Sequence, residues 1–422
     1  MKRRGLWAND DFLKLWIGET ISILGSFVGR TALAFTAVLV LDASAIEVGL
    51  LVAADIVPGL AFGFLAGVWV DRFNRRPIMI AADVGRALLL GTVPLAYVFD
   101  SLTIGQLYVV AVGTGSLTIF ADVAYFAYVP SLLAKDELLE GNSKVAATNA
   151  VAEVGGFGAA GWLVQALTGP GAIALDAVSF LVSSVFTLGI RKPEVPAERP
   201  EAPPKLWHEV TEGVRTIVRY PVLRVLAASD VAVALSFGVF GAVYMLLVTK
   251  DLGFQPGVLG MFFAVGGVTS LLGSIYAARA GRTFGTGPTI AGGRVIMGGF
   301  MFLMVFAHDA SLFAAAILIG QQLGDGFYAA ADVNDTTLRQ SVTPAAVLGR
   351  VNAAKRQAVL AATLVGALLG GVIGEFAGLR TALVIGCAGT LLGGAIATLP
   401  PVWGTRAIPA DELGAGVAPV EP

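Results

Sequence analysis

The sequence has few of the residues on which many enzymes and nucleic-acid-binding proteins depend. Its 422 residues include one cysteine, Cys387, and two histidines, His208 and His308. This excludes an intrachain disulfide and leaves no Cys/His spacing for a zinc site. No Walker A sequence is present for binding ATP phosphates. The net charge of -2 provides no basic surface for nucleic acid. We therefore expect no metal, no cofactor and no nucleic-acid partner.

Charged residues are also scarce. They make up 14% of the chain, whereas apolar residues make up 56%. Typical soluble domains have about 25% charged and about 45–50% apolar residues. A soluble protein of this composition would lack the polar side chains to cover its surface, and a disordered chain would be far more polar. The 53 glycines suit closely packed transmembrane helices. We expect an all-α polytopic membrane protein.

Apolar runs long enough to cross a bilayer occur twelve times, since one span needs about 20 residues. The first run is too long for a signal peptide and is interpreted as an uncleaved helix. The predicted spans are 13–41, 46–70, 78–99, 105–133, 143–168, 170–190, 222–249, 257–279, 288–307, 311–340, 350–376 and 380–400.

Lysine and arginine predict the orientation of the spans. With the N-terminus inside, 23 of the 28 basic residues fall in cytoplasmic segments, and only Lys250 and Arg380 fall outside. This asymmetry predicts that both termini and the central loop are cytoplasmic.

Four segments are predicted along the chain: a six-helix half at 1–190, a linker at 191–221, a second six-helix half at 222–400 and a tail at 401–422. The linker starts Pro/Glu-rich and ends in an amphipathic stretch with Val210, Val214 and Val218 at helical spacing. That helix either lies in the membrane interface or packs on the end of the bundle.

The two halves also match each other. A shift of 210 places Ala121-Asp122-Val123 on Ala331-Asp332-Val333, and Asn142 on Asn352. We therefore predict two parallel six-helix pseudo-repeats, an architecture typical of transporters that rock around a midplane site.

A motif between the second and third spans resembles a signature of the major facilitator superfamily. Gly67-Val-Trp-Val-Asp71-Arg72-Phe-Asn-Arg75-Arg76 matches G-x-x-x-D-R-x-G-R-R except at Asn74. Segments 83–87, 175–181 and 348–352 are similar to the twelve-helix drug:proton antiporters that include macrolide efflux proteins and the enterobactin exporter. The resemblance implies a monomer in a bacterial-type inner (cytoplasmic) membrane that exports a small molecule by proton antiport.

Two features depart from that family. The antiporter motif G-x-x-x-G-P-x-x-G-G is represented by residues 152–161, where Phe157 replaces the proline. An arginine of the fourth span, often tied to proton transfer in the family, is absent, and Arg30 is a candidate substitute. Both departures weaken the prediction of antiport. The glycines of the motif are equally explained by close helix packing.

Charged residues inside predicted spans are the candidates for proton coupling. A charge at the centre of a membrane helix costs about 2.5–3.5 kcal/mol on insertion scales, so it needs a partner or a wet cavity. A carboxyl group that loses its hydration binds a proton more readily. We predict coupling roles for Asp55, Asp122 and Glu153, with Arg30 as electrostatic partner. For each, the alternative is a structural ion pair or an interhelical hydrogen bond.

The resemblance implies that the first, fourth, seventh and tenth spans line a substrate cavity. Their candidate lining residues are Glu19, Asp230, Tyr244, Asp325, Tyr328 and Asp332. It also implies a gate in which Asp71 lies beside the start of the eleventh helix, near Gly349. The candidate gate residues are Gly67, Asp71, Arg72, Arg75, Arg76, Asp83 and Arg86. For Arg75 and Arg76, solvated charges that fix the topology are the preferred alternative.

The sequence thus predicts a secondary transporter, not an enzyme, working by alternating access. Its small-molecule substrate would be drug-like or siderophore-like, and its other partners would be protons and the lipid bilayer. A facilitator or importer of the same fold is the first alternative. A membrane sensor or scaffold that transports nothing is the second. A lipid-modifying enzyme is disfavoured because no nucleophile–His or metal arrangement is present.

Overall fold

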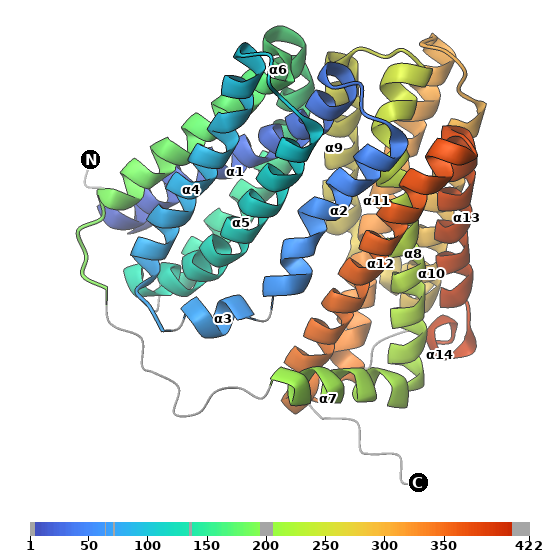
Figure 1. The fold of residues 1–422 in the computed structure, drawn as a ribbon. Helices are drawn as coiled ribbons and strands as arrows, with labels where there is room; N and C mark the ends of the chain where they lie inside the picture. The colour runs from blue at the N-terminus through green and yellow to red at the C-terminus, as the bar shows by residue number, and fades with distance from the viewer. Residues whose placement is uncertain (1–4, 64, 71, 135–136, 195–205, 407–422) are drawn as a thin grey trace. The chain divides into compact units, whose positions relative to one another are not determined.

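A computed structural model describes residues 5–63, 65–70, 72–134, 137–194 and 206–406. Within these ranges the chain folds into helices joined by short turns, without a β-strand (Figure 1). The elements up to residue 188 are η1 Gly5–Ala8, α1 Asp10–Phe35, η2 Thr36–Val40, α2 Ala45–Phe62, α3 Leu65–Val70, α4 Arg75–Val98, α5 Ile104–Leu132 and α6 Leu138–Leu188. The remaining elements are α7 Leu206–Arg219, α8 Pro221–Leu246, η3 Leu247–Asp251, α9 Pro256–Phe284, α10 Thr286–Leu303, η4 Met304–Phe306, α11 Leu312–Val342, η5 Ala345–Val347, α12 Leu348–Phe376, α13 Leu379–Ala397 and α14 Pro400–Trp403.

Ten of the described helices are long and apolar enough to cross a membrane. One of them, α6, has 51 residues and breaks at Thr168, where φ is 65° and ψ is 169°, so it supplies two spans. A further helix, α11, has 31 residues but is less apolar, because Gln321, Gln322 and Asp325 interrupt it. The twelve predicted spans are therefore all present as helices, and the predicted fold class is confirmed.

One predicted span ends earlier than expected. The stretch 46–70 is divided into α2, which ends at Phe62, and the six-residue α3. Gly63 forms a turn after α2, donating its N–H to the Gly59 carbonyl at 3.1 Å. The hydropathy of the stretch gave no sign of this break, because the residues around Gly63 are as apolar as those before them.

The chain forms two compact units. Unit 1 contains Met1–Ala43, Ala54–Pro204 and Gln255–Ala264, and unit 2 contains Ser44–Ala53, Lys205–Phe254 and Val265–Pro422. Each unit thus includes one short segment from the opposite half of the sequence. A shift of 211 residues carries Ser44–Ala53 onto Gln255–Ala264, so the two exchanged segments are repeat-related. The segment boundaries predicted at residues 190 and 221 stay predictions.

The backbone repeats its irregular features at spacings of 210 or 211 residues. A five-residue π-helical turn follows α1 at Thr36–Val40 and recurs after α8 at Leu247–Asp251. Left-handed residues also recur, because Thr168 with φ 65° corresponds to Gly378 with φ 91°. π-turns and left-handed residues are uncommon, so their recurrence supports a duplicated six-helix unit.

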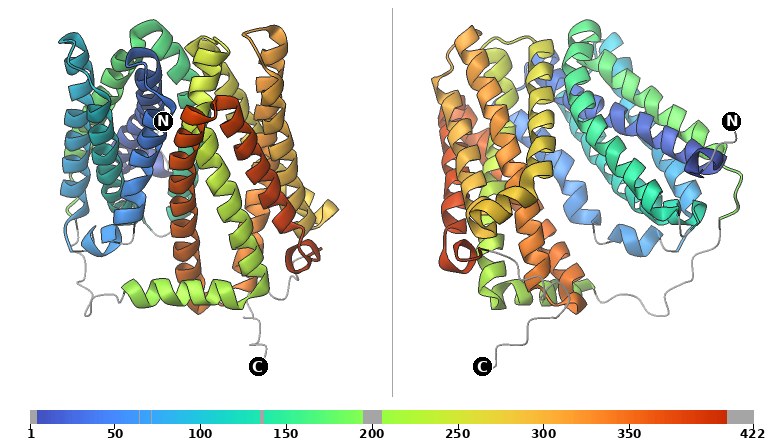
Figure 2. Two further views of the ribbon diagram at one scale, coloured as in Figure 1. Left: turned by 45° about the vertical axis from the view of Figure 1, so that its right-hand side comes forward. Right: turned by 180° about the vertical axis from the view of Figure 1, so that it is seen from behind.

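The helices of each unit pack closely side by side (Figures 1 and 2). In unit 1, α1 packs against α6, and α4 packs against both α5 and α6. In unit 2, α8 packs against α12 and α13, and α10 against α11 and α13. Glycines permit this approach. A Cβ at Gly238 of α8 would overlap the backbone of α12, and one at Gly273 of α9 would overlap that of α11.

The amphipathic linker helix is present as α7. It lies across the ends of α8 and α12 (Figures 1 and 2). A Cβ at Gly213 would overlap the carbonyl oxygen of Arg350, so α7 rests directly on the first turn of α12. Packing on the bundle end is therefore observed, and because Val214 and Val218 remain exposed, a position in the membrane interface stays a prediction.

Candidate functional site

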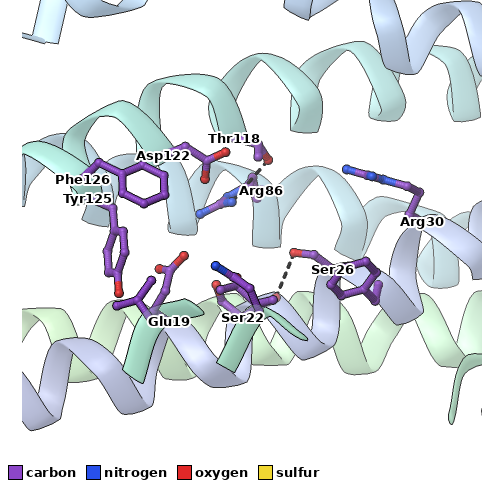
Figure 3. Close-up of a pocket in the computed structure, with 13 residues that line it drawn as sticks. Glu19, Ser22, Ser26, Arg30, Arg86, Thr118, Asp122, Tyr125 and Phe126 are labelled. Atoms are coloured by element: carbon purple, nitrogen blue, oxygen red, sulfur yellow. Dashed lines mark hydrogen bonds between the residues drawn. The ribbon is translucent and has the colours of Figure 1, made fainter. Parts of the chain in front are cut away.

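Unit 1 contains a cavity of about 320 Å³ (Figure 3). Four helices contribute to it: α1, α4, α5 and α6. Its lining residues are Glu19, Ser22, Ile23, Ser26, Phe27, Arg30, Arg86, Thr118, Asp122, Tyr125, Phe126, Val145 and Asn149. A mixture of acids, bases, hydroxyls and aromatic rings is typical of a small-molecule site in the interior of a helix bundle.

Arg86 of α4 is the best-fixed charge in this wall. Its side chain is buried and donates a hydrogen bond to the Thr118 hydroxyl at 3.3 Å. The guanidinium also pairs with Asp83 on the preceding turn. Its carbon lies 4.0 Å from the centre of the Phe180 ring, a cation–π contact. Three partners on three helices therefore hold this positive charge at the cavity.

Two carboxylates approach the same place from opposite walls. Glu19 projects from α1 and Asp122 from α5, with the Arg86 side chain between them (Figure 3). Glu19 is half-buried and makes no hydrogen bond or ion pair with any residue that the structure describes. An acidic side chain in this position can pair with a cationic group of a molecule bound in the cavity.

The predicted coupling pair Arg30 and Asp55 forms an ion pair. Nε of Arg30 lies 3.8 Å from Oδ2 of Asp55, and the two side chains are 62% and 44% exposed. Exposed pairs of this kind contribute about 0–1 kcal/mol, so the contact can break at little cost. Because Arg30 also lines the cavity, it is free to turn toward a bound molecule.

The fourth coupling candidate lies elsewhere. Glu153 is exposed on α6 and is absent from the residues lining the cavity. It makes no ion pair with any side chain in the described ranges. The cavity thus includes Asp122 and Arg30 directly and Asp55 through Arg30, but not Glu153. The coupling role of each residue stays a prediction.

Sequence reasoning assigned no role to Asp176, which is 3% exposed on α6. Its carboxylate accepts a hydrogen bond from the Ser179 hydroxyl at 3.2 Å. It also lies against α1 at Gly25 and Gly29, where an added Cβ would overlap it. The spacing Gly25-x-x-x-Gly29 was the available signal, since small residues four apart mark close helix contacts.

The gate motif has both exposed and bonded members. Asp71 lies outside the described residues. Gly67 is in α3, and a Cβ there would meet no described atom within 4 Å. Arg72 is exposed in the turn before α4. The structure therefore shows no close contact with a described backbone that would require glycine at position 67.

Arg75 and Arg76 connect the start of α4 to the end of α6 and the residues that follow it. The backbone N–H groups of both residues donate to the Glu194 carboxylate, at 2.6 and 3.2 Å. The Arg76 side chain donates to the carbonyl oxygens of Thr187 at 3.0 Å and Leu188 at 2.6 Å, at the end of α6. Arg76 therefore caps α6 and Glu194 caps the start of α4, so the Arg76 side chain is not simply a solvated loop charge.

Unit 2 contains a network of buried ion pairs, whereas the acidic side chains Glu19 and Asp122 of unit 1 line a cavity. Nη2 of Arg294 lies 2.6 Å from Asp230 and 2.9 Å from Asp335. Nζ of Lys355 lies 2.7 Å from Asp230 and 2.8 Å from Asp335, and Arg339 adds a contact of 2.8 Å to Asp335. These residues come from α8, α10, α11 and α12. Asp230, predicted to line the substrate cavity, pairs with Arg294 and Lys355, and its part in substrate binding stays a prediction.

The other predicted cavity residues of unit 2 are not part of this ion-pair network. Asp325 is half-buried and makes no ion pair with a described side chain; a Cβ at Gly266 would lie 2.7 Å from its Oδ2. The Tyr328 ring meets Phe237 edge-on at 5.3 Å, and the Tyr244 ring lies 4.8 Å from Phe240. Asp332 is exposed on α11. Their part in substrate binding stays a prediction.

Within the described ranges, no three His, Cys, Asp or Glu side chains cluster closely enough to hold an ion. The twelve helices, the internal repeat and a mixed-charge cavity are features of a multi-pass membrane transporter. The sequence profile of the Major Facilitator Superfamily matches residues 15–356. The chain belongs to this superfamily.

Related sequences and structures agree with this assignment. The chain is 26% identical over 408 residues to the MFS-type transporter YfiS of Bacillus subtilis (strain 168), covering 90% of this chain and 91% of the relative. It is 22% identical over 206 residues to macrolide efflux protein A of Streptococcus pyogenes, covering 49% and 51% of the two chains. The fold is similar to the nucleoside transporter NupG, with a TM-score of 0.75 and 11% identity over 92% of this chain and 98% of that one. It is also similar to a bacterial homologue of the iron transporter ferroportin, with a TM-score of 0.73 and 16% identity over 91% and 98%.

Proposed function

We propose that this transporter exports a small drug-like or siderophore-like molecule by proton antiport through alternating access. The observation that carries the proposal is the cavity of unit 1, where Glu19 and Asp122 lie on either side of the fixed Arg86 guanidinium (Figure 3). The likeness to macrolide efflux protein A, over half of each chain, adds support for export.

The cavity provides a physical basis for exchange of a proton for a substrate. Arg86 is paired with Asp83 and Arg30 with Asp55, so Glu19 and Asp122 are the acidic groups of the cavity that would take up or release a proton. A cationic or strongly polar substrate group would favour the charged carboxylates and release their protons. Proton uptake would in turn weaken the hold on the substrate, because the attraction is lost.

Aromatic and hydroxyl groups suit the remainder of such a substrate. Phe27, Tyr125 and Phe126 offer ring faces, and Ser22 and Asn149 offer hydrogen bonds. The volume of about 320 Å³ is at the lower end for drug-sized ligands, so this cavity would hold part of a larger molecule. Arg30 and Asp55 would serve as a second, easily opened ion pair in coupling.

The resemblance-based gate is part of the proposal. Asp71 would act in the cytoplasmic gate that the resemblance implies, and Arg75 and Arg76 would hold the start of α4 to the end of α6. We further propose a monomer in a bacterial-type inner membrane with both termini cytoplasmic, as the distribution of lysine and arginine predicts.

A facilitator or importer of the same fold is the second candidate. It is favoured by Phe157 at the proline position of the antiporter motif and by the absence of an arginine in α5. Such a protein would move its substrate down a gradient and would ignore an imposed pH difference.

Uptake into everted membrane vesicles distinguishes the two candidates. A panel of lipophilic cations, macrolides and siderophores would be screened with and without an acidic interior. Antiport predicts uptake that collapses when a protonophore removes the pH difference. Uptake that is unchanged by the protonophore would contradict antiport and support the facilitator.

A further inference from the structure

A second cavity, of about 500 Å³, lies in unit 2 beside the linker helix. One wall is the face of α7 that carries Thr211, Arg215 and Arg219. The opposite wall contains Pro344 and Val347, in the turn that precedes α12. None of these residues belongs to the cavity of unit 1 or to the proposed coupling machinery.

The cavity has an excess of positive charge. Arg215 and Arg219 lie one helical turn apart on the same face, are exposed, and make no ion pair with any side chain that the structure describes. Glu212 also lines the cavity, but its carboxylate is engaged by Nη1 of Arg350 at 2.6 Å. Two guanidinium groups are therefore left to bind an anion.

Guanidinium groups and hydroxyls together match a phosphate. Arginine presents a planar fork of N–H donors that binds two phosphate oxygens at once. Tyr220 lines the same cavity, and its side chain carries a hydroxyl that can donate a hydrogen bond. A carboxylate ligand would use the arginines equally well, but the location of the cavity favours phosphate.

The position of α7 favours a lipid as the source of that phosphate. α7 lies across the ends of the spanning helices α8 and α12 (Figures 1 and 2), where the surface of a bilayer would meet the protein. Val214 and Val218, on a neighbouring face of α7, are 47% and 56% exposed. A helix with exposed apolar and basic faces at the end of a bundle has the features of one that rests at the lipid–water boundary.

We propose that the α7 cavity binds the phosphodiester headgroup of an anionic phospholipid. This inference is independent of the proposed antiport. Because α7 is fixed to the first turn of α12 at Gly213 and Arg350, a bound lipid would hold this part of unit 2 at the membrane surface.

The test titrates phosphatidylglycerol against the purified full chain in neutral detergent, with phosphatidylcholine and inorganic phosphate as comparison ligands. We expect saturable binding of phosphatidylglycerol at least tenfold tighter than that of phosphatidylcholine. One basic residue near a membrane surface contributes about 1 kcal/mol, which is roughly fivefold in affinity. Arg215→Gln should therefore weaken binding roughly fivefold, and Arg215→Gln/Arg219→Gln roughly thirtyfold.

The matched control removes two other exposed arginines of unit 2. Arg279 and Arg282 lie near the end of α9 and line neither cavity. Arg279→Gln/Arg282→Gln should leave the affinity for phosphatidylglycerol unchanged, and Arg215→Lys/Arg219→Lys should retain most of it. Equal losses in the two glutamine pairs would overturn the proposal in favour of general charge attraction. Displacement of the lipid by an equal concentration of inorganic phosphate, or no preference over phosphatidylcholine, would also overturn it.

Discussion

Arg86 of α4 donates a hydrogen bond to the Thr118 hydroxyl of α5 at 3.3 Å, across the wall of the unit 1 cavity. With Asp83 and the Phe180 ring as further partners, this contact fixes a positive charge inside the bundle. Glu19 and Asp122, the proposed coupling carboxylates, lie on either side of this charge (Figure 3).

Removing the arginine should therefore destabilise the protein. Arg86→Gln leaves Asp83 buried without its ionic partner, and breaking a buried pair in this way costs about 3–5 kcal/mol. Asp83→Asn/Arg86→Gln removes both charges and should recover more than half of that loss. Thermal unfolding in detergent measures both. A double variant no more stable than Arg86→Gln would show that the ion pair is not the source of the stability.

A substitution at the left-handed residue of α6, Thr168, should increase the stability of the protein. Thr168 adopts φ 65°, whereas its repeat equivalent is Gly378 with φ 91°. An L-residue with a Cβ pays roughly 1–2 kcal/mol in this region, and glycine does not. Thr168→Gly should raise the free energy of unfolding by up to about 1 kcal/mol after the entropy of the unfolded chain is counted.

The companion variant is Gly378→Ala, which should lower stability by about 1 kcal/mol. Unfolding followed by tryptophan fluorescence in detergent compares the two variants with the natural chain. A destabilised Thr168→Gly would indicate that the threonine side chain, not the backbone, determines this turn.

The link between α4 and α6 depends on Glu194. Its carboxylate accepts the N–H groups of Arg75 and Arg76, at the positive end of α4. Glu194→Ala should cost about 1 kcal/mol, the usual value of a lost N-cap. Hydrogen exchange should increase in the first turn of α4 and remain unchanged in α10. Arg72→Gln, which alters an exposed arginine of the same motif, should change neither quantity.

A substitution in the buried charge network of unit 2 should lower the stability of the protein far more than one at the exposed Asp332. Lys355→Met removes contacts to both Asp230 and Asp335 and leaves excess negative charge buried. The expected loss is about 3–5 kcal/mol. Asp332→Asn, on exposed surface of the same unit, should lie within about 0.5 kcal/mol of the natural chain. Similar losses in both variants would contradict the assignment of the network.

Much of the fold follows from the sequence, because hydropathy reveals span number directly and the repeat appears in aligned Asp, Asn and Gly residues. The candidate site is harder to predict from the sequence. Spans such as α5 are apolar on nearly all sides, so the sequence does not determine which face of each helix turns inward. For this reason Arg86 was assigned to the gate although it lines the cavity, and Glu153 was grouped with residues that it does not approach.

The network around Arg294 illustrates the same limit. It joins Asp230, Arg294, Asp335 and Lys355 from four separate helices. Each residue is recognisable from the sequence as a charge or a possible partner, but their pairing depends on helix rotation and tilt. Those quantities are decided by side-chain packing across the whole unit.

Substrate-induced proton release in proteoliposomes tests the central claim most directly. A pH-sensitive dye would report protons released when an active compound is added to the natural chain, to Asp122→Asn, Glu19→Gln and Glu153→Gln, and to Glu140→Gln as a control of the same charge type outside the predicted site. We expect release by the natural chain and by Glu140→Gln, and its loss in Asp122→Asn, Glu19→Gln or both, while Glu153→Gln tests the remaining predicted coupling carboxylate. Undiminished release in both cavity variants, with substrate still transported, would contradict it.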